Sequence, residues 1–274
     1  MAVKHPIGVF DSGYGGLTVL KQIVQQLPQF DYMYLGDNAR SPYGSRSFET
    51  VYNYTWQCVQ WLFNQGCPLV ILACNTASAK ALRTIQQTVL DKNHPGKRVL
   101  GVIRPTTEII GKFSKSGHVG VLGTQGTVQS NSYPIEINKF FPGLQVHQQA
   151  CPMWVPLVEH NEYDTEGADF FIQKDLQLLM DQSGDIDAIL LACTHYPLLA
   201  DRIRKFVPEP VKLLSQGEIV AASLQDYLQR HPEIAGTCTT SSNRVFYTTD
   251  QPEDFDKHAS VFFGEPVLSR HVEL

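Results

Sequence analysis

The chain has 274 residues, of which 43% are hydrophobic and 18% charged, and its formal net charge is −5. This length and composition are those of a globular protein with one large or two medium α/β domains. The negative net charge and the absence of a Lys/Arg cluster argue against nucleic-acid binding. No apolar stretch approaches the roughly 20 residues that a membrane-spanning helix requires.

The N-terminal residues and the cysteines indicate the compartment. Residues 1–6 contain no apolar core of a secretion signal and lead directly into a predicted strand. The six cysteines form no C-x-x-C pair, and the spacing of Cys193 and His195 does not match usual zinc ligands. We therefore expect reduced thiols, a cytoplasmic location and no bound metal.

The first predicted unit is a strand at residues 7–10, a glycine-rich turn at 11–16 and a helix that ends at Pro28. The glycines do not follow the G-x-G-x-x-G spacing and no G-K-[ST] follows, so the turn does not favour a nucleotide site. Asp11 and Ser12 place a carboxylate and a hydroxyl at the end of the strand, where open α/β sheets bind ligands. The simpler interpretation of Asp11 is a helix cap.

A second strand is predicted at residues 32–35, followed by a polar loop at 36–44 and a helix at 47–64. The loop contains Pro42, Tyr43 and Gly44. It can fold over a ligand and contact it through Tyr43 and backbone N–H groups, or it can be an ordinary surface loop.

The third strand is the apolar run at residues 70–73, which leads into Cys74 and a predicted helix at 79–90. We expect Asn75 or Thr76 to cap this helix, so that its free N–H groups face the space beyond the strand. Cys74 would then lie at a ligand site. A buried structural cysteine is the alternative.

In the second part of the chain, strands are predicted at residues 119–122 and 144–149, with hydroxyl groups such as Thr124 just after the first of these. Glu159 ends an apolar, proline-containing segment and is either an acid near the thiols or a surface charge. Further elements are predicted as helices at 169–181 and 218–229, strands at 211–214 and 244–247, a surface loop at 231–243 and a last helix that ends at 263.

The strongest signal is a repeat. Residues 189–196 repeat the pattern of residues 70–78, an apolar strand, Ala-Cys and then small polar residues, and Cys193 follows Cys74 by 119 residues. Residues 8–13 and 120–125 match in the same way. We therefore expect two pseudo-symmetric open-sheet α/β domains, residues 1–98 with 211–274 and residues 99–210, and an active site in the cleft between them. The C-terminal tail is expected to pack on the first domain.

Two thiols on equivalent elements suggest proton transfer at opposite faces of one carbon atom, as in racemisation or epimerisation. The thiolate is the working base, and it is scarce at pH 7 for an ordinary cysteine. Asp11, His195 and the helix N-termini can each assist ionisation or orient the substrate. A cysteine hydrolase is a weaker alternative, because covalent catalysis needs one nucleophile and a base. A non-catalytic amino-acid-binding protein is disfavoured by the two thiols.

Four motifs in this order resemble those of glutamate racemases, and the resemblance extends over nearly the whole chain. The motifs are Asp11-Ser12-Gly13-x-Gly15-Gly16-Leu17-Thr18, Ala39-Arg40-x-Pro42-Tyr43-Gly44, Ala73-Cys74-Asn75-Thr76-Ala77-Ser78 and Ala192-Cys193-Thr194-His195-Tyr196-Pro197. Arg104 departs from the pattern, which has an acidic residue there. A related amino-acid racemase, such as an aspartate racemase, is the nearest alternative.

The resemblance implies cofactor-independent interconversion of L- and D-glutamate, which supplies D-glutamate for peptidoglycan, and it implies a homodimer. It makes Cys74 and Cys193 the acid–base catalysts, with support from Asp11 and His195. Glu159 is added to this catalytic set as the candidate acid near the thiols, from its place in the sequence and not from the resemblance. The implied substrate contacts are Asp11, Ser12, Tyr43, Gly44, Asn75, Thr76, Thr194 and His195. We add Pro42 and Thr124 as further candidate contacts.

Overall fold

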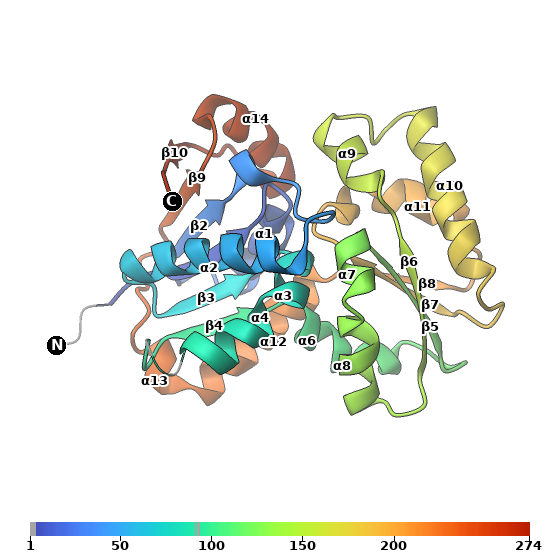
Figure 1. Ribbon diagram of the computed structural model, residues 1–274, viewed down its shortest axis with the longest axis horizontal. Coiled ribbons are helices and arrows are strands. Elements are labelled where there is room, and N and C mark those ends of the chain that lie inside the picture. The colour runs from blue at the N-terminus through green and yellow to red at the C-terminus, as the bar shows by residue number, and fades with distance from the viewer. Residues whose placement is uncertain (1–3, 91, 93) are drawn as a thin grey trace.

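The computed structural model describes residues 4–90, 92 and 94–274, and shows two α/β halves that lie side by side (Figure 1). The first half contains a parallel sheet of β1 (Ile7–Asp11), β2 (Tyr32–Gly36), β3 (Leu69–Leu72), β4 (Arg98–Gly101), β9 (Arg244–Thr248) and β10 (Ser269–His271). The second half contains β5 (His118–Gly123), β6 (Gln145–Ala150), β7 (Ala188–Ala192) and β8 (Lys212–Leu214), also parallel.

The strand order confirms the predicted repeat. It is β10-β9-β2-β1-β3-β4 in the first sheet and β6-β5-β7-β8 in the second. The run β2-β1-β3-β4 therefore has the same arrangement as β6-β5-β7-β8. The strands that lead to Cys74 and Cys193, β3 and β7, occupy equivalent positions. The predicted fold class, two related open-sheet α/β units, is thus observed.

The helices cover both faces of the sheets. In the first half they are α1 (Gly16–Gln26), α2 (Phe48–Asn64), α3 (Asn75–Lys80), α4 (Leu82–Thr84), α12 (Gly217–Arg230), α13 (Pro232–Ala235) and α14 (Pro252–Phe263). In the second half they are α6 (Ile103–Thr107), α7 (Gln125–Gln129), α8 (Ser132–Phe140), α9 (Trp154–Glu159), α10 (Glu166–Met180) and α11 (Ala200–Phe206). Shorter 3-10 or π turns are η1 (Asn38–Arg40), η2 (Ile85–Leu90), η3 (Ile110–Lys112) and η4 (Tyr196–Leu199).

Strand side chains alternate between the two faces, and this alternation explains the layers. In the first sheet, Val9 and Ile71 belong to the apolar cluster that contains the buried residues of α1 and α12. Phe10 and Leu72, one position further along, belong to the cluster that contains those of α2. Both strands are buried over their full length, as expected for parallel strands between two helical layers.

Several local predictions need correction. The helical region after Cys74 begins at Asn75, not at residue 79, and the predicted loop at 231–243 contains α13. Strand β10 was not predicted, because three residues carry too little hydrophobic pattern. The C-terminal tail does pack on the first half, since β9 pairs with β2 from Tyr32↔Arg244 to Gly36↔Thr248.

The sheets also move the domain boundaries predicted at 98/99 and 210/211. Residues 99–101 belong to β4, which pairs with β3, and β8 pairs with β7 in the second sheet. Both are short edge strands, whose sequences do not indicate which sheet they join. We propose that the chain crosses between the halves near Val102 and near Gln216.

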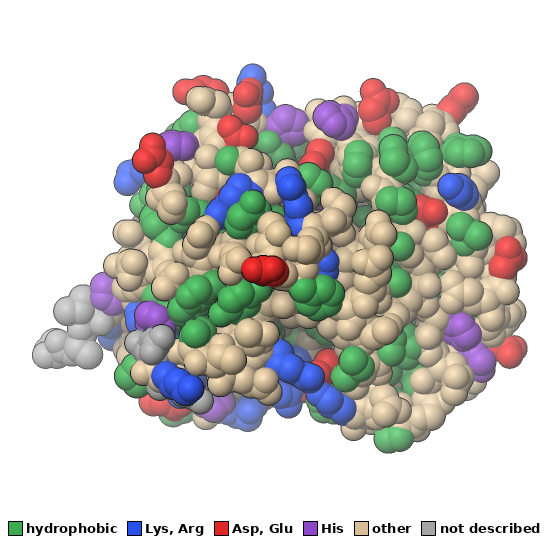
Figure 2. Space-filling view, in the orientation of Figure 1, with side chains coloured by type: hydrophobic (Ala, Val, Ile, Leu, Met, Phe, Trp, Pro, Cys, Tyr) green, Lys and Arg blue, Asp and Glu red, His purple; other side chains and the backbone are tan. Residues whose placement is uncertain are grey.

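None of the described helices has both the length and the hydrophobicity that a bilayer span requires. On the face shown in Figure 2, acidic and basic side chains are interspersed with apolar and uncharged ones.

Candidate active site

A cavity of about 200 Å³ lies between the halves, at the carboxyl ends of both sheets. Residues that follow β1, β3, β5, β6 and β7 line it. The predicted site residues among them are Ser12, Pro42, Tyr43, Gly44, Cys74, Asn75, Thr76, Thr124, Cys193, Thr194 and His195. Asp11 and Glu159 do not line the cavity, but each contacts a residue that does.

Cys74 lies at the N-terminus of α3 and is 5% exposed. Its own side chain caps this helix, in place of the predicted Asn75 or Thr76, because Sγ accepts a hydrogen bond from Ala77 N at 3.4 Å. Ser12 Oγ lies 3.5 Å from the same sulfur. Burial and then the charge of Asp11 raise the pKa of Cys74 to about 12, although the contacts with Ser12 and Ala77 oppose this shift.

Cys193 faces a different environment, which is built from His195 and Glu159. His195 Nδ1 lies 3.9 Å from Cys193 Sγ, and its Nε2 lies 3.0 Å from Glu159 Oε1. Burial alone lowers the pKa of His195, but the contacts with Cys193 and Glu159 outweigh burial and raise it to about 10. The ring is therefore an imidazolium at neutral pH, and its positive charge lies beside the sulfur of Cys193. Glu159, left open by the sequence, holds this ring.

Asp11 is fully buried at the end of β1, between elements of the two halves. It accepts a hydrogen bond from Gly13 N at 2.9 Å, and Thr194 Oγ1 of the second half lies 3.4 Å from Oδ2. Burial raises the pKa of Asp11, and the charge of His195 opposes that shift. Asp11 thus links the turn after β1 to the turn after β7, one layer behind the cavity wall.

Gly15 allows these two turns to approach. A Cβ atom at this position would lie 2.2 Å from Thr194 Oγ1 and 2.5 Å from His195 Nδ1. Thr18 Oγ1 also donates to the carbonyl oxygen of Thr194 at 2.9 Å. The glycine-rich turn therefore serves contact between the two halves, in agreement with its poor match to a nucleotide-binding pattern.

Hydroxyl and amide groups form the polar wall of the cavity. Thr76 Oγ1 of the first half lies 2.9 Å from Thr124 Oγ1 of the second. The Asn75 amide donates to Gln216 Oε1 at 2.7 Å and accepts from the Tyr133 hydroxyl at 2.6 Å. One Nδ2 hydrogen of Asn75 therefore remains for another acceptor.

The loop at residues 36–44, for which the sequence left two interpretations open, contributes Ser41, Pro42, Tyr43 and Gly44 to the lining of the cavity. Tyr43 is buried and its hydroxyl donates to Asp37, which also pairs with Arg40. Gly126 N of α7 donates to Gly44 O at 2.8 Å, so the loop of the first half is attached to the second half.

The sequence did not indicate every lining residue. The additional ones are Ser41, Ser45, Gln125, Cys151, Pro152, Val155 and Pro156. Cys151 follows β6 directly, so the rule that identified Cys74 also applies to it. The apolar residues at the start of α9 have no chemical signature that would distinguish them from core residues.

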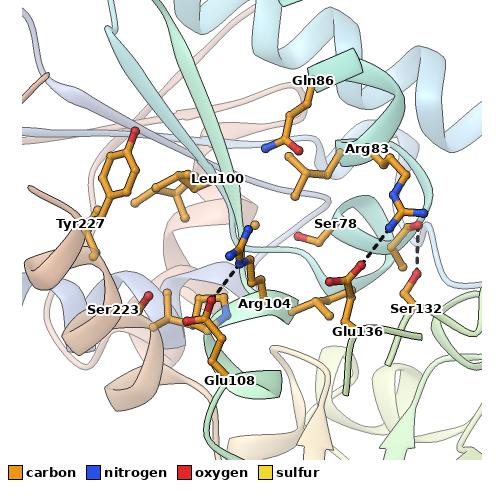
Figure 3. A pocket seen from close by; sticks show the side chains of 18 of the residues that line it. Ser78, Arg83, Gln86, Leu100, Arg104, Glu108, Ser132, Glu136, Ser223 and Tyr227 are labelled. Atoms are coloured by element: carbon orange, nitrogen blue, oxygen red, sulfur yellow. Dashed lines mark hydrogen bonds and ion pairs between the residues drawn. The ribbon is translucent and has the colours of Figure 1, made fainter. Parts of the chain in front are cut away.

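A second cavity, of about 610 Å³, lies on another side of the junction and contains neither thiol (Figure 3). Arg83 of α4 and Glu136 of α8 line it, and their ion pair at 2.9 Å joins the two halves. Arg104, the departure from the family pattern, lies here and pairs with Glu108 at 2.8 Å. It is therefore not a residue of the thiol-containing cavity.

Two thiols on equivalent elements that line one cavity can act on opposite faces of a small molecule. The described residues contain no group of three or more His, Cys, Asp and Glu side chains placed to hold a metal ion.

Comparisons with known proteins agree with this geometry. The model of the Asp/Glu/Hydantoin racemase family matches residues 7–224. A glutamate racemase of Geobacter metallireducens is 39% identical over 258 residues, 94% of this chain and 92% of that protein. A glutamate racemase isoform of Bacillus anthracis superposes with a TM-score of 0.89 at 36% identity, over 98% of each chain. The Francisella tularensis glutamate racemase, crystallised with D-glutamate, gives 0.87 at 31% identity, also over 98% of each chain.

Proposed function

The chain belongs to the Asp/Glu/hydantoin racemase family and, within it, to the glutamate racemases, and we propose that Cys74 and Cys193 are the two acid–base catalysts of its reaction. The observation that carries this proposal is their equivalence: each thiol follows the same strand of a repeated half, and both line one cavity. Glutamate bound between them presents one face of its Cα to each sulfur.

The reaction is a balanced exchange of protons. One cysteine, as a thiolate, removes the Cα proton, and the electron pair is delocalised into the α-carboxylate. The other cysteine, as a thiol, then donates its proton to the opposite face of Cα. The product has inverted configuration, and the two cysteines have exchanged protonation states, so that the enzyme is ready for the reverse direction. Each positioned acid or base typically contributes 10²–10⁴-fold to the rate.

The supporting residues differ on the two sides. On the Cys193 side, the imidazolium of His195, oriented by Glu159, places a positive charge next to the sulfur. On the Cys74 side, the substrate ammonium compensates the negative charge of Asp11, which is one cause of the raised pKa of this thiol, and thereby lowers that pKa. Asp11 therefore acts as a charge partner of the ammonium or as a base for Cys74.

The substrate carboxylates are held mainly by neutral donors. The residues with suitable groups are Ser12, Asn75, Thr76, Thr124 and Thr194, together with the backbone N–H groups of Tyr43 and Gly44. Fixed donors of this kind discriminate between substrates, because a shorter substrate leaves some of them unpaired.

We further propose that the enzyme acts without a cofactor, as a homodimer in the cytoplasm, and supplies D-glutamate for peptidoglycan. All six cysteines are free thiols, which supports a reducing compartment. The dimer is proposed from the family resemblance alone, and analytical ultracentrifugation tests it.

The main experiment follows the circular dichroism of D- and L-glutamate with protein dialysed against EDTA and without added pyridoxal phosphate. Both enantiomers should approach the same racemic endpoint, and solvent deuterium should enter at Cα. Activity that requires a metal or pyridoxal phosphate would contradict the proposal.

A further inference from the structure

Lys80 is a buried cation that the mechanism above does not use. It is the last residue of α3, it is 7% exposed, and its Nζ donates to the carbonyl oxygen of Arg46 at 2.6 Å. No ion pair found among the described residues includes Lys80. Since an ammonium carries three donor hydrogens and a full charge, one backbone carbonyl compensates it only in part.

The ammonium lies directly behind one wall of the thiol-containing cavity. A Cβ atom on Gly126 would lie 2.8 Å from Lys80 Nζ and 2.8 Å from Gly44 O. Nζ is therefore next to the contact between the loop of the first half and α7 of the second. Gly44, Ser45 and Gln125, which flank that contact, line the cavity.

The surroundings of Lys80 allow its positive charge to act on the adjacent wall of the cavity. The ring of Phe48 lies 4.9 Å from Nζ, and Lys80 is buried. A charge shielded from solvent is screened little by salt and water. No lysine or arginine is found among the described residues that line the cavity, so Lys80 is a source of positive potential for an anion at this wall.

We propose that Lys80 determines specificity for a substrate with a second, side-chain carboxylate, by stabilising that carboxylate through the wall formed by residues 44–46. The inference rests on the proposed function, because it concerns the substrate of the same cavity. Lys80 does not touch the substrate and takes no part in proton transfer. It makes the cavity favour a carboxylate over the isosteric amide at the end of the side chain.

A purely structural role, in which the Nζ hydrogen bond only holds Arg46, is the competing explanation. Three variants separate the two. Lys80→Gln removes the charge but keeps a hydrogen-bond donor, Lys80→Arg keeps both, and Lys80→Met removes both. Lys97→Gln is a matched control, because Lys97 Nζ also donates to backbone carbonyls, at 2.9 Å to Gly66 and 2.8 Å to Cys67, and Lys97 does not line the cavity.

The experiment measures, for the full-length chain, the dissociation constants of D-glutamate and D-glutamine by calorimetry, and KM and kcat for glutamate. We expect Lys80→Gln to weaken glutamate binding roughly tenfold and glutamine binding less than about twofold, as a lost buried charge predicts. KM for glutamate should rise by a similar factor with little change in kcat. Lys80→Arg and Lys97→Gln should stay within about threefold of the parent protein in every measurement.

Equal weakening of both ligands by Lys80→Gln, or normal glutamate binding by that variant, would overturn the proposal. If Lys80→Met does not fold, the Gln and Arg variants still decide the question. A failure of the proposed function has a different signature, because the parent protein would then bind glutamate without racemising it. In that event the selectivity measured by calorimetry still tests Lys80.

Discussion

His195 Nε2 lies 3.0 Å from Glu159 Oε1, so a carboxylate of α9 fixes the ring that faces Cys193. The pair joins residues that are 36 positions apart in the sequence. Because the ring is held between a carboxylate and a sulfur, its protonation state depends on both neighbours.

The pKa of His195 provides the first prediction. Its folded-state value of about 10 is above the ordinary 6.5, so protonation stabilises the folded protein fully below about pH 6.5. This contribution is lost as the pH rises through about 10. Glu159→Gln should lower the pKa of His195, so that the loss occurs at lower pH. Histidine NMR titration measures the pKa of His195, and Tm between pH 6 and pH 10 measures the pH dependence of stability. Glu162→Gln, which changes a nearby exposed carboxylate, is the control. An unchanged titration in Glu159→Gln would contradict the assignment.

Gly15→Ala should disrupt the contact between the two halves. The added Cβ would overlap Thr194 Oγ1 and His195 Nδ1, so the turns after β1 and β7 must move apart. We expect kcat/KM for glutamate to fall at least about 100-fold, as small displacements of catalytic groups produce such losses. Gly184→Ala is the control, because nothing lies within 4 Å of a Cβ built at Gly184. Equal activity of the two variants would show that the close approach at Gly15 has no catalytic importance.

Gln216 links both halves and the two crossing segments. Its Nε2 lies 3.0 Å from Thr106 Oγ1 and 2.8 Å from the Tyr133 hydroxyl, and its Oε1 accepts from Asn75. Gln216→Leu removes one hydrogen-bond partner from each of these buried groups and should cost about 2–5 kcal/mol of stability. It should also raise KM, because Asn75 lines the cavity.

Thr106→Val is the milder companion to Gln216→Leu. It removes one acceptor from the same network and should cost about 1 kcal/mol. Urea denaturation and glutamate kinetics measure both variants. If the two substitutions were equally mild, Gln216 would not be the centre of the network.

The sequence predicted the thiols better than their surroundings. Cys74, Cys193 and the small polar residues after them were predictable, because the carboxyl ends of buried parallel strands meet at one edge of a sheet. The partner of Asn75 was not predictable, since Gln216 lies 141 residues away and reaches it only through the packing of the halves. Glu159 was ambiguous for the same reason.

Short elements explain the errors in the fold. Strand β8 joins the second sheet through three residues, and β10 joins the first through three. Neither strand is long enough to show the alternation of apolar and polar residues that identifies a strand. The sheet that each one joins therefore depends on the neighbouring strands. Cys74 acts as the cap of α3, a role that Asn75 and Thr76 would ordinarily take.

Substrate length should matter strongly. Donors on both sides of the cavity are fixed by the loop and by α7, so aspartate cannot pair with all of them at once. We expect kcat/KM for glutamate to exceed that for aspartate by at least about 100-fold, measured by Cα deuterium exchange with each amino acid. Comparable values would favour the alternative, an aspartate racemase or another amino-acid racemase of the same superfamily.

The last prediction separates the two thiols. If each cysteine serves one face of Cα, Cys74→Ala and Cys193→Ala should each reduce racemisation in both directions, by at least about 10²–10⁴-fold. A substrate analogue with a β-leaving group needs only one base for elimination. Cys74→Ser and Cys193→Ser should therefore eliminate opposite enantiomers of such an analogue, because the remaining thiolate reaches only its own face.

The family resemblance suggests that Cys74 acts on D-glutamate, so Cys193→Ser should retain elimination of the D-analogue. Cys151→Ser is the control for the two active-site variants, since Cys151 is a third thiol that lines the cavity but has no counterpart in the repeat. It should racemise glutamate within about threefold of the parent rate, as expected for a group that does not transfer a proton. If Cys74→Ser and Cys193→Ser eliminated the same enantiomer, or if Cys193→Ala racemised normally, one cysteine would have to act on both faces. The equivalence of β3 and β7 would then have no part in the chemistry.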